Sequence, residues 1–381
     1  MKKIFSILLV FCLMLITACS SNTNGGTESA NKEDLSDITI GIVGYMNTGP
    51  DYEAIEAFYE KVSKATGIKF KYVIGDSFDE SKNVTAVQNL ISSGANGIIM
   101  TMDSGMQSIM QEAESANVYV AGYMTGMEQS MSKIKDNKYF LGTVNDGVAD
   151  GSVIGNKAAE LVIKNNNKNV GVITFPKIYF PNQEQADKAF RAKIDEYNKT
   201  AGTQDQITVN DTVELSFQPL EDNYFKENNN IDSIFSLAAG FVYPTMVSAN
   251  VENITLYSTG YDNTESYMKA FEEGTLGLQS VSNIEAMIYP IALIANAIKN
   301  EQFADKPKAS EAVDTSIVFL TNMEDEKAFE ENTIFSSADG AKSLLSDDEI
   351  ISLIKVTNAD ASYENLVKTI QSWSIEELKA K

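Results

Sequence analysis

Short runs of apolar residues alternate with amphipathic stretches from residue 37 onward. The runs 37–44, 70–75 and 96–101 are rich in Ile and Val, which predicts buried strands. The stretches between them, 50–66 and 80–94, place apolar residues at helical spacing. Buried strands that alternate with helices predict parallel sheets covered by helices on both faces.

The pattern of strands and helices starts again near residue 139. The run 139–144 precedes a predicted helix at about 148–164, and the run 169–175 resembles the first strand in composition. A mature chain of about 360 residues also exceeds what one hydrophobic core usually supports. We therefore expect two α/β lobes of similar size. The alternative is one large doubly wound sheet.

The last 60 or so residues add further amphipathic stretches, which predict helices at about 347–355 and 365–380. Trp373, the single tryptophan, lies among them and is expected to pack against the body of the protein. The alternative is that Trp373 lies on a surface that binds a partner. The acidic runs 324–326 and 347–349 are expected to be solvated or to cap helices, and not to hold metal.

The N-terminus has the layout of a secretory signal. A short basic start, MKK, precedes the apolar run Ile4–Ile16. Thirteen helical residues reach about 20 Å, whereas the hydrocarbon core of a membrane is about 30 Å thick. The run therefore predicts a signal peptide and not a permanent membrane span. Residues 20–36 are polar and rich in Ser, Asn and Gly, which predicts a flexible tether.

Composition excludes several classes of function. The chain has 53 acidic and 30 basic residues, which argues against binding nucleic acid. It has no histidine and two cysteines, Cys12 and Cys19, both near the N-terminus. The commonest general base, zinc ligand and thiol nucleophile are thus missing from the part expected to fold. We expect no catalytic residue, no metal and no cofactor.

Several segments, in their order along the chain, resemble the bacterial substrate-binding lipoproteins of ABC importers that have the ribose-binding-protein fold. They include GIVGYMNTGPDYEAIEAFYEKVSKATG, AVQNLISSGANGIIMTMDSG and GTVNDGVADGSVIGNKAAELV. The likeness covers about residues 37–322. It implies two Rossmann-like lobes with parallel sheets, joined by a hinge, and leaves a helical C-terminal extension. By position, the chain would cross between the lobes near Met124, near Ser282 and within 306–314.

These expectations divide the chain into a signal peptide, a lipidated cysteine with its tether, two discontinuous lobes and an extension. The corresponding residues are 1–18 for the signal peptide, 19–36 for the tether, 37–125 and 283–310 for the N-terminal lobe, 126–282 and 311–322 for the C-terminal lobe, and 323–381 for the extension.

The segment LITAC, residues 15–19, resembles a bacterial lipobox. This resemblance implies cleavage after Ala18 and a diacylglycerol on the sulfur of Cys19, which would hold the protein on the extracytoplasmic face of the cell membrane. The alternative is an ordinary secreted protein with a chance cysteine.

Candidate ligand-binding residues follow from the fold, because open α/β sheets bind ligands beyond the carboxyl ends of their strands. Asp103 and Asp262 could accept hydroxyl hydrogen bonds, and each could instead cap the next helix. Tyr123 and Phe180 could stack on a ring, or could instead pack in the hinge or in the core. The full set of expected ligand residues is Tyr45, Tyr52, Asp103, Tyr123, Asn145, Phe180 and Asp262.

The resemblance implies a monomeric, non-enzymatic receptor that delivers a sugar or sugar-like molecule to ABC permease subunits and touches the membrane through its lipid alone. Three sites that are polar in many sugar binders, 123–124, 186 and 238–239, are apolar or aromatic here. A nucleoside or other aromatic ligand, or a larger glycan, is therefore an alternative. A sensing or interaction lipoprotein that is not coupled to transport is another.

Overall fold

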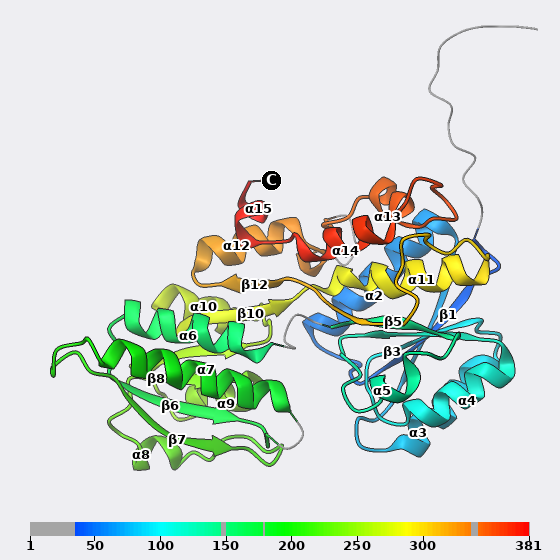
Figure 1. Ribbon diagram of the computed structural model, residues 1–381. Helices are drawn as coiled ribbons and strands as arrows, with labels where there is room; N and C mark the ends of the chain where they lie inside the picture. The colour runs from blue at the N-terminus through cyan, green and yellow to red at the C-terminus, as the bar shows by residue number, and fades with distance from the viewer. Residues whose placement is uncertain (1–34, 146–149, 178–179, 337–341, 381) are drawn as a thin grey trace, which may run out of the picture. The chain divides into compact units, whose positions relative to one another are not determined.

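The computed structural model describes residues 35–145, 150–177, 180–336 and 342–380, which form one compact unit. Within these ranges it contains two six-stranded sheets, each covered by helices on both faces (Figure 1). This architecture confirms the expected two-lobed α/β fold. We call each sheet with its covering helices a lobe.

The sheet of the first lobe is entirely parallel, with the strand order β11-β5-β4-β3-β1-β2. Its central strands are buried because they carry Ile, Val and Met on both faces, as covered parallel strands do. The strands are β1 (Thr39–Gly44), β2 (Lys69–Ile74), β3 (Gly97–Met100), β4 (Tyr119–Tyr123), β5 (Phe140–Asn145) and β11 (Ala312–Asp314).

The sheet of the second lobe has the order β12-β10-β9-β8-β6-β7, and β12 alone runs antiparallel to its neighbour. Its strands are β6 (Asn169–Thr174), β7 (Thr208–Glu214), β8 (Ser233–Ser236), β9 (Thr255–Thr259), β10 (Leu276–Ser282) and β12 (Ile317–Leu320).

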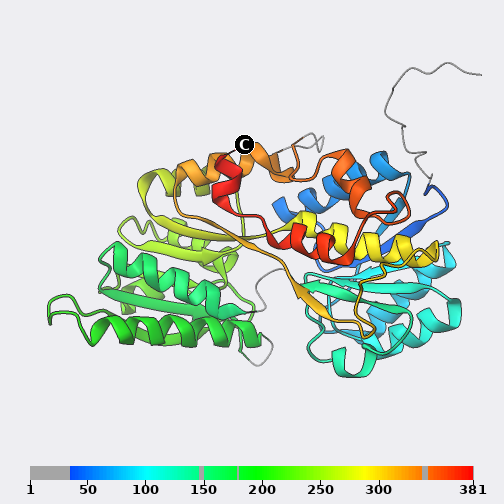
Figure 2. The same cartoon turned by 45° about the horizontal axis from the view of Figure 1, so that its top comes forward.

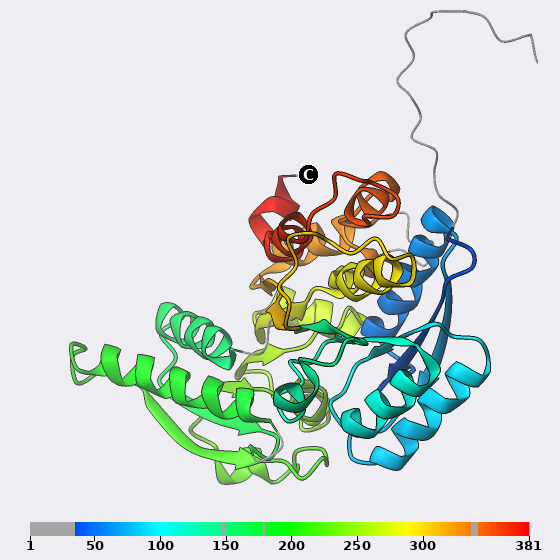
Figure 3. The same ribbon diagram turned by 45° about the vertical axis from the view of Figure 1, so that its right-hand side comes forward.

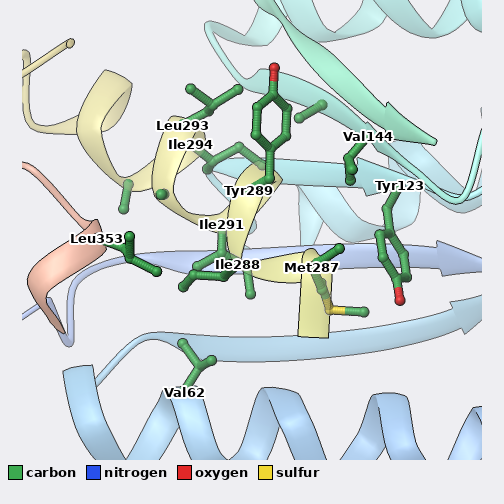
Figure 4. Packing of buried hydrophobic residues seen from close by; sticks show 14 of the residues in the cluster. Val62, Tyr123, Val144, Met287, Ile288, Tyr289, Ile291, Leu293, Ile294 and Leu353 are labelled. Atoms are coloured by element: carbon green, nitrogen blue, oxygen red, sulfur yellow. The ribbon is translucent and has the colours of Figure 1, made fainter. Parts of the chain in front are cut away.

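Two hydrophobic cores fill the first lobe, one on each face of its sheet. One core lies under α3 (Glu80–Ser92) and α4 (Met106–Ala116), and the other under α2 (Pro50–Thr66) and α11 (Ile288–Ile298). Figure 4 shows the second of these, where α11 places Ile288, Ile291 and Ile294 among side chains of the sheet. All residues of α11 from Ile288 to Ala297 are buried, because a helix that is apolar all round needs cover on every side.

The second lobe packs α6 (Gly151–Lys164) and α7 (Pro181–Asn198) on one face of its sheet, side by side (Figure 3). A side chain at Gly155 would collide with the carbonyl of Ala186, so glycine at this position allows the close approach of the two helices. The other face carries α8 (Tyr224–Glu227), α9 (Ala239–Ser248) and α10 (Glu265–Glu273).

The chain first leaves the first lobe after Asn145, so the expected crossing near Met124 is wrong. Strand β5 pairs in parallel with β4, with Tyr123 opposite Val144. The helix between them, α5, has four residues, Met131–Ile134. The chain returns to the first lobe after β10, which ends at Ser282 in the second sheet, because Ile284 lies in the core of the first lobe. The third crossing follows β11, which pairs with β5 and so places 312–314 in the first lobe and not in the second.

The C-terminal segment consists of short helices that lie over both lobes. Figure 2 shows it, in orange and red, passing along α11. Trp373 is 9 % exposed within the core under α2 and α11, so it packs against the body of the protein. The helices are α12 (Met323–Asn332), η2 (Ile334–Ser336), α13 (Asp347–Leu353), α14 (Tyr363–Gln371) and α15 (Ile375–Lys379).

The two acidic runs of this segment form the first turns of α12 and α13, where negative charge favours the helix. Asn322 and Ser346 cap these helices, and Ser346 forms a capping box with Glu349. Glu326 differs from the expected solvated acid, because it is fully buried.

Candidate functional site

Asp103 lies beyond the carboxyl end of β3, in a loop of the first lobe. Its Oδ2 accepts a hydrogen bond of 2.7 Å from the backbone N–H of Gln129, in the loop after β4. Its Oδ1 is buried and has no hydrogen-bond partner among the described residues. Asp103 does not cap α4, because Gly105 occupies the N-cap position and no side chain bonds to the first turn there. The structure thus fixes one carboxylate oxygen and leaves the other without a donor.

Tyr45 and Tyr52 lie near the same edge of the first sheet, after β1. Tyr45 is 46 % exposed. The ring of Tyr52, in the first turn of α2, meets the ring of Tyr72 edge-on at 5.2 Å, and the Tyr72 hydroxyl donates to the Met46 carbonyl at 2.6 Å. Burial raises the pKa of the neighbouring Asp51 to about 6. The edge therefore combines aromatic rings with two carboxyl groups that are partly withdrawn from water.

Asp262 follows β9 in the second lobe. Its Oδ1 accepts from the backbone N–H of Thr264 at 2.8 Å, and its backbone carbonyl accepts from the side chain of Gln279 at 3.1 Å. The cap of α10 is Thr264, which makes no side-chain cap bond. Asp262 therefore shapes its own loop at the carboxyl end of the sheet, and its Oδ2 accepts no hydrogen bond from the described residues.

Phe180 precedes α7 and belongs to a group of phenylalanines at the carboxyl ends of the strands. We call this group the phenylalanine cluster. Its central ring, Phe175, stacks on Phe217 at 5.2 Å and meets Phe241 at 5.1 Å. The cluster consists of Phe78, Phe175, Phe180, Phe217 and Phe241.

The phenylalanine cluster joins the two lobes. Phe78 lies in the first lobe between β2 and α3, is 63 % exposed, and meets Phe217 of the second lobe edge-on at 5.6 Å. Phe217 adopts a left-handed backbone with φ of 56°, which costs roughly 1 kcal/mol for a residue other than glycine. This contact brings strand-end loops of both sheets to one place.

Tyr123 ends β4 inside the first lobe, and Asn145 ends β5, where the chain leaves that lobe. Tyr123 is 1 % exposed within the core shown in Figure 4, and its hydroxyl donates to the Ile284 carbonyl at 2.9 Å. Asn145 is 6 % exposed, and its carbonyl accepts from the backbone N–H of Thr315. For Tyr123 the structure therefore favours the packing alternative over ring stacking. Asp146 lies outside the described residues, as does Cys19.

Of the expected residues, Tyr45, Tyr52 and Asp103 lie at the carboxyl ends of strands of the first sheet. Phe180 and Asp262 lie at the carboxyl ends of strands of the second sheet. Sequence reasoning missed four members of the phenylalanine cluster. Phe175 ends a predicted strand, which was a usable signal, whereas Phe217 lies in a polar loop and had none. Gln129 was also missed, because it acts through its backbone.

Across the described ranges, no three His, Cys, Asp or Glu side chains gather as metal ligands would. In the same ranges, none of the helices combines the length and apolar character needed to cross a bilayer.

Comparison with known proteins gives the family. Residues 40–302 match the model of the periplasmic binding protein domain. The ribose import binding protein RbsB of Bacillus subtilis is 27 % identical over 131 residues, which are 34 % of this chain and 43 % of that protein. The chain thus matches less than half the length of this curated relative.

Solved structures share the fold at low identity. A solute-binding protein of an ABC transporter from Actinobacillus succinogenes with bound D-allose matches with a TM-score of 0.58 at 16 % identity, over 77 % of this chain and all of that one. The glucose-galactose binding protein GanP of Geobacillus stearothermophilus matches with a TM-score of 0.55 at 12 % identity, over 76 % and 98 %. The two lobes with mostly parallel sheets are consistent with the match over residues 40–302, and the chain belongs to the periplasmic binding protein domain family.

Proposed function

We propose that this protein is a lipid-anchored extracellular receptor that binds a sugar or sugar-like molecule between its two lobes and delivers it to an ABC importer. The observation that carries the proposal is the geometry of Asp103. One carboxylate oxygen is fixed by the Gln129 N–H, and the other is buried without a donor. A ligand hydroxyl would supply that donor, and a hydrogen bond to a charged group contributes about 1.5–3 kcal/mol.

The names of the relatives support this ligand class. The curated relative is a ribose import binding protein, and one solved structure holds D-allose. Hydroxyl groups of such ligands suit Asp103 in the first lobe and Oδ2 of Asp262 in the second. Closure of the hinge would bury the ligand between both, and the ligand would favour the closed state by the contacts it makes there alone. No residue needs to perform catalysis.

The membrane anchor rests on the sequence. The segment LITAC completes the apolar run that begins at Ile4, and it ends at Cys19, outside the described residues; the polar residues 20–36 follow it. A lipid on Cys19 would hold the receptor beside its permease on the extracytoplasmic face of the cell membrane.

A second ligand class is favoured by the phenylalanine cluster. Phe175, Phe180 and Phe217 lie together at the carboxyl ends of the second sheet, and Phe78 approaches them from the first lobe. Phenylalanine rings stack on flat apolar faces. The base of a nucleoside, or another aromatic ligand, would therefore pack against them better than a fully hydroxylated sugar would.

Thermal unfolding against a ligand panel separates these classes. The panel holds D-ribose, D-allose, D-glucose, D-galactose, adenosine and uridine. A ligand present at 100 times its dissociation constant adds about 2.7 kcal/mol of stability, which raises the midpoint by several degrees. A shift with a sugar supports the main proposal, and a shift with a nucleoside supports the second class. If no member of the panel shifts the unfolding midpoint, both proposed ligand classes are wrong.

A further inference from the structure

The C-terminal segment crosses between the lobes twice more, beyond the three hinge crossings. It leaves β12 in the second lobe, where Phe329 of α12 lies in the core. Ile334 then belongs to the core of the first lobe, and the ring of Phe335 lies 4.8 Å from that of Tyr261. Trp373 is in the first lobe's core and Leu378 in the second's. The segment therefore goes from the second lobe to the first and returns.

The last helix of this segment, α15, is bonded to its first helix, α12. Lys379 Nζ of α15 lies 2.6 Å from Asp325 Oδ1 of α12, and the Asp325 side chain is 6 % exposed. Asn332 also donates to the carbonyl of Leu378 at 3.1 Å. Both ends of the loop that the segment makes over the first lobe are thus held on the second lobe.

The segment also bonds to the second hinge crossing. Glu285 lies three residues after β10 and is 1 % exposed. Its carboxylate accepts from the backbone N–H groups of Leu344 at 2.7 Å and Leu345 at 3.0 Å, and from the hydroxyl of Ser343. A buried carboxylate is destabilising unless donors bond to it. Glu285, at this crossing, therefore depends on the C-terminal segment for its hydrogen bonds.

The third hinge crossing is held in the same way. Thr315 lies between β11 and β12, and its hydroxyl donates to the Ile370 carbonyl at 2.6 Å. The backbone N–H of Ser316 donates to the same carbonyl at 3.3 Å. Gln371 Nε2 donates to the Asp314 carbonyl at 3.0 Å. Because hinge motion requires backbone dihedral angles to change at such crossings, these bonds oppose it.

We propose that residues 323–336 and 342–380 form a strap across the hinge that limits how far the two lobes rotate apart. The strap lies outside the residues that match the family model, which end at 302. The matched residues contain the first two hinge crossings, and the strap follows the third. The inference does not depend on which ligand the protein binds.

The distance between labels on the two lobes tests the strap. A chain that begins at Ser20 lacks both native cysteines and keeps every described residue. Gln88→Cys on α3 and Ala192→Cys on α7 then place spin labels at exposed positions of the first and second lobe. Pulsed electron resonance on the ligand-free protein gives the distribution of inter-lobe distances.

Two substitutions remove strap bonds at the hinge, and a third provides a matched control. Thr315→Val and Ser343→Ala each delete one hydroxyl donor at a crossing. Thr357→Val deletes a hydroxyl that donates to the Ile351 carbonyl at 2.6 Å, wholly within the strap. We expect the two hinge variants to broaden the distance distribution toward longer distances, and the control to leave it unchanged.

Thermal unfolding of all three variants separates loosening of the hinge from general loss of stability. A distribution that stays at the parent's width in both hinge variants would overturn the proposal. So would equal broadening in Thr357→Val, since that would show a general loosening. The panel of ligands has no bearing on either result, so failure of the strap and failure of the binding proposal are distinguishable.

Discussion

Asp103 Oδ2 lies 2.7 Å from the backbone nitrogen of Gln129, so the loop after β4 holds the carboxylate that follows β3. This bond orients Asp103 before any ligand arrives, and preorganisation of this kind lowers the ordering cost of binding. The oxygen that Gln129 does not use is the one we assign to a ligand hydroxyl.

Asp103→Asn should weaken binding of a hydroxylated ligand roughly 10- to 100-fold, because it replaces a charged acceptor by a neutral amide. The readout is the ligand-induced shift of the unfolding midpoint. Asp232→Asn is the matched control, since Asp232 also accepts a backbone N–H, that of Lys168 at 2.6 Å, but at the amino-terminal end of its sheet. An unchanged shift in Asp103→Asn would remove Asp103 from the site.

Glu326→Gln should stabilise the protein above neutral pH. Burial and the carboxylates of Glu330, Asp262 and Asp325 together raise the pKa of Glu326 to about 7, although the nearby Tyr261 hydroxyl lowers it. Neither of its oxygens has a hydrogen-bond partner among the described residues. The unfolded chain loses this proton near pH 4.5 and the folded one near 7, so stability falls as pH rises between the two values. The cost above pH 7 is roughly 3 kcal/mol.

Unfolding midpoints measured from pH 4 to pH 8 test this account of Glu326. The gain from Glu326→Gln should be absent near pH 4 and should grow up to about pH 7. Glu331→Gln, an exposed acid on the same helix, should show no such trend. A gain that is equal at all pH values would mean that ionisation of Glu326 is not its cause.

Asp187→Ala should destabilise the second lobe by about 3–5 kcal/mol, because it leaves the side chains of Lys177 and Arg191 without their shared carboxylate. The buried Asp187 carboxylate accepts from Lys177 Nζ at 2.7 Å, Arg191 Nε at 2.7 Å and the Thr212 hydroxyl at 2.6 Å. Burial raises the pKa of Asp187, but these donors outweigh burial and leave it below the ordinary value.

The effect of Asp187→Ala should shrink as pH falls. A carboxyl with a lowered folded pKa stabilises above its unfolded value and loses that contribution as acid protonates it. Denaturant unfolding at pH 7 and pH 3 measures the difference. Glu184→Gln removes an exposed pair with Lys188 on the same helix and should change little. Similar losses for Asp187→Ala and Glu184→Gln at pH 7 would refute the buried network.

Leu366→Ala should cost about 2–5 kcal/mol of unfolding free energy, because Leu366 of α14 is fully buried in the first lobe's core. Trp373 stays in place and reports unfolding by its fluorescence. Val247→Ala, at a position 55 % exposed on α9, should change stability by less than about 0.5 kcal/mol. Equal effects of the two substitutions would show that the C-terminal segment is not part of the core.

The sequence predicted most of the local structure and the two-lobed fold, because strand and helix periodicity is a local property. It misplaced β5, since the sheet that an apolar strand joins depends on distant pairing with β4. It singled out Asp103 and Asp262 as candidates because they lie at or just after the ends of predicted strands. It could not predict the burial of Glu326, which lies in an acidic run typical of a solvated helix start. Nor could it predict Phe217, whose three ring partners, Phe78, Phe175 and Phe180, come from two loops that are distant in sequence.

Calorimetric titration tests the central claim, binding of a small hydroxylated molecule at Asp103, most directly. D-ribose, D-allose, D-glucose, D-galactose and adenosine would each be titrated into the parent chain and into Asp103→Asn. We predict one-to-one binding of a sugar to the parent at micromolar concentration or tighter, with affinity reduced at least tenfold in the variant. No heat of binding for any of the sugars at millimolar concentration, or equal affinity in both proteins, would contradict the account.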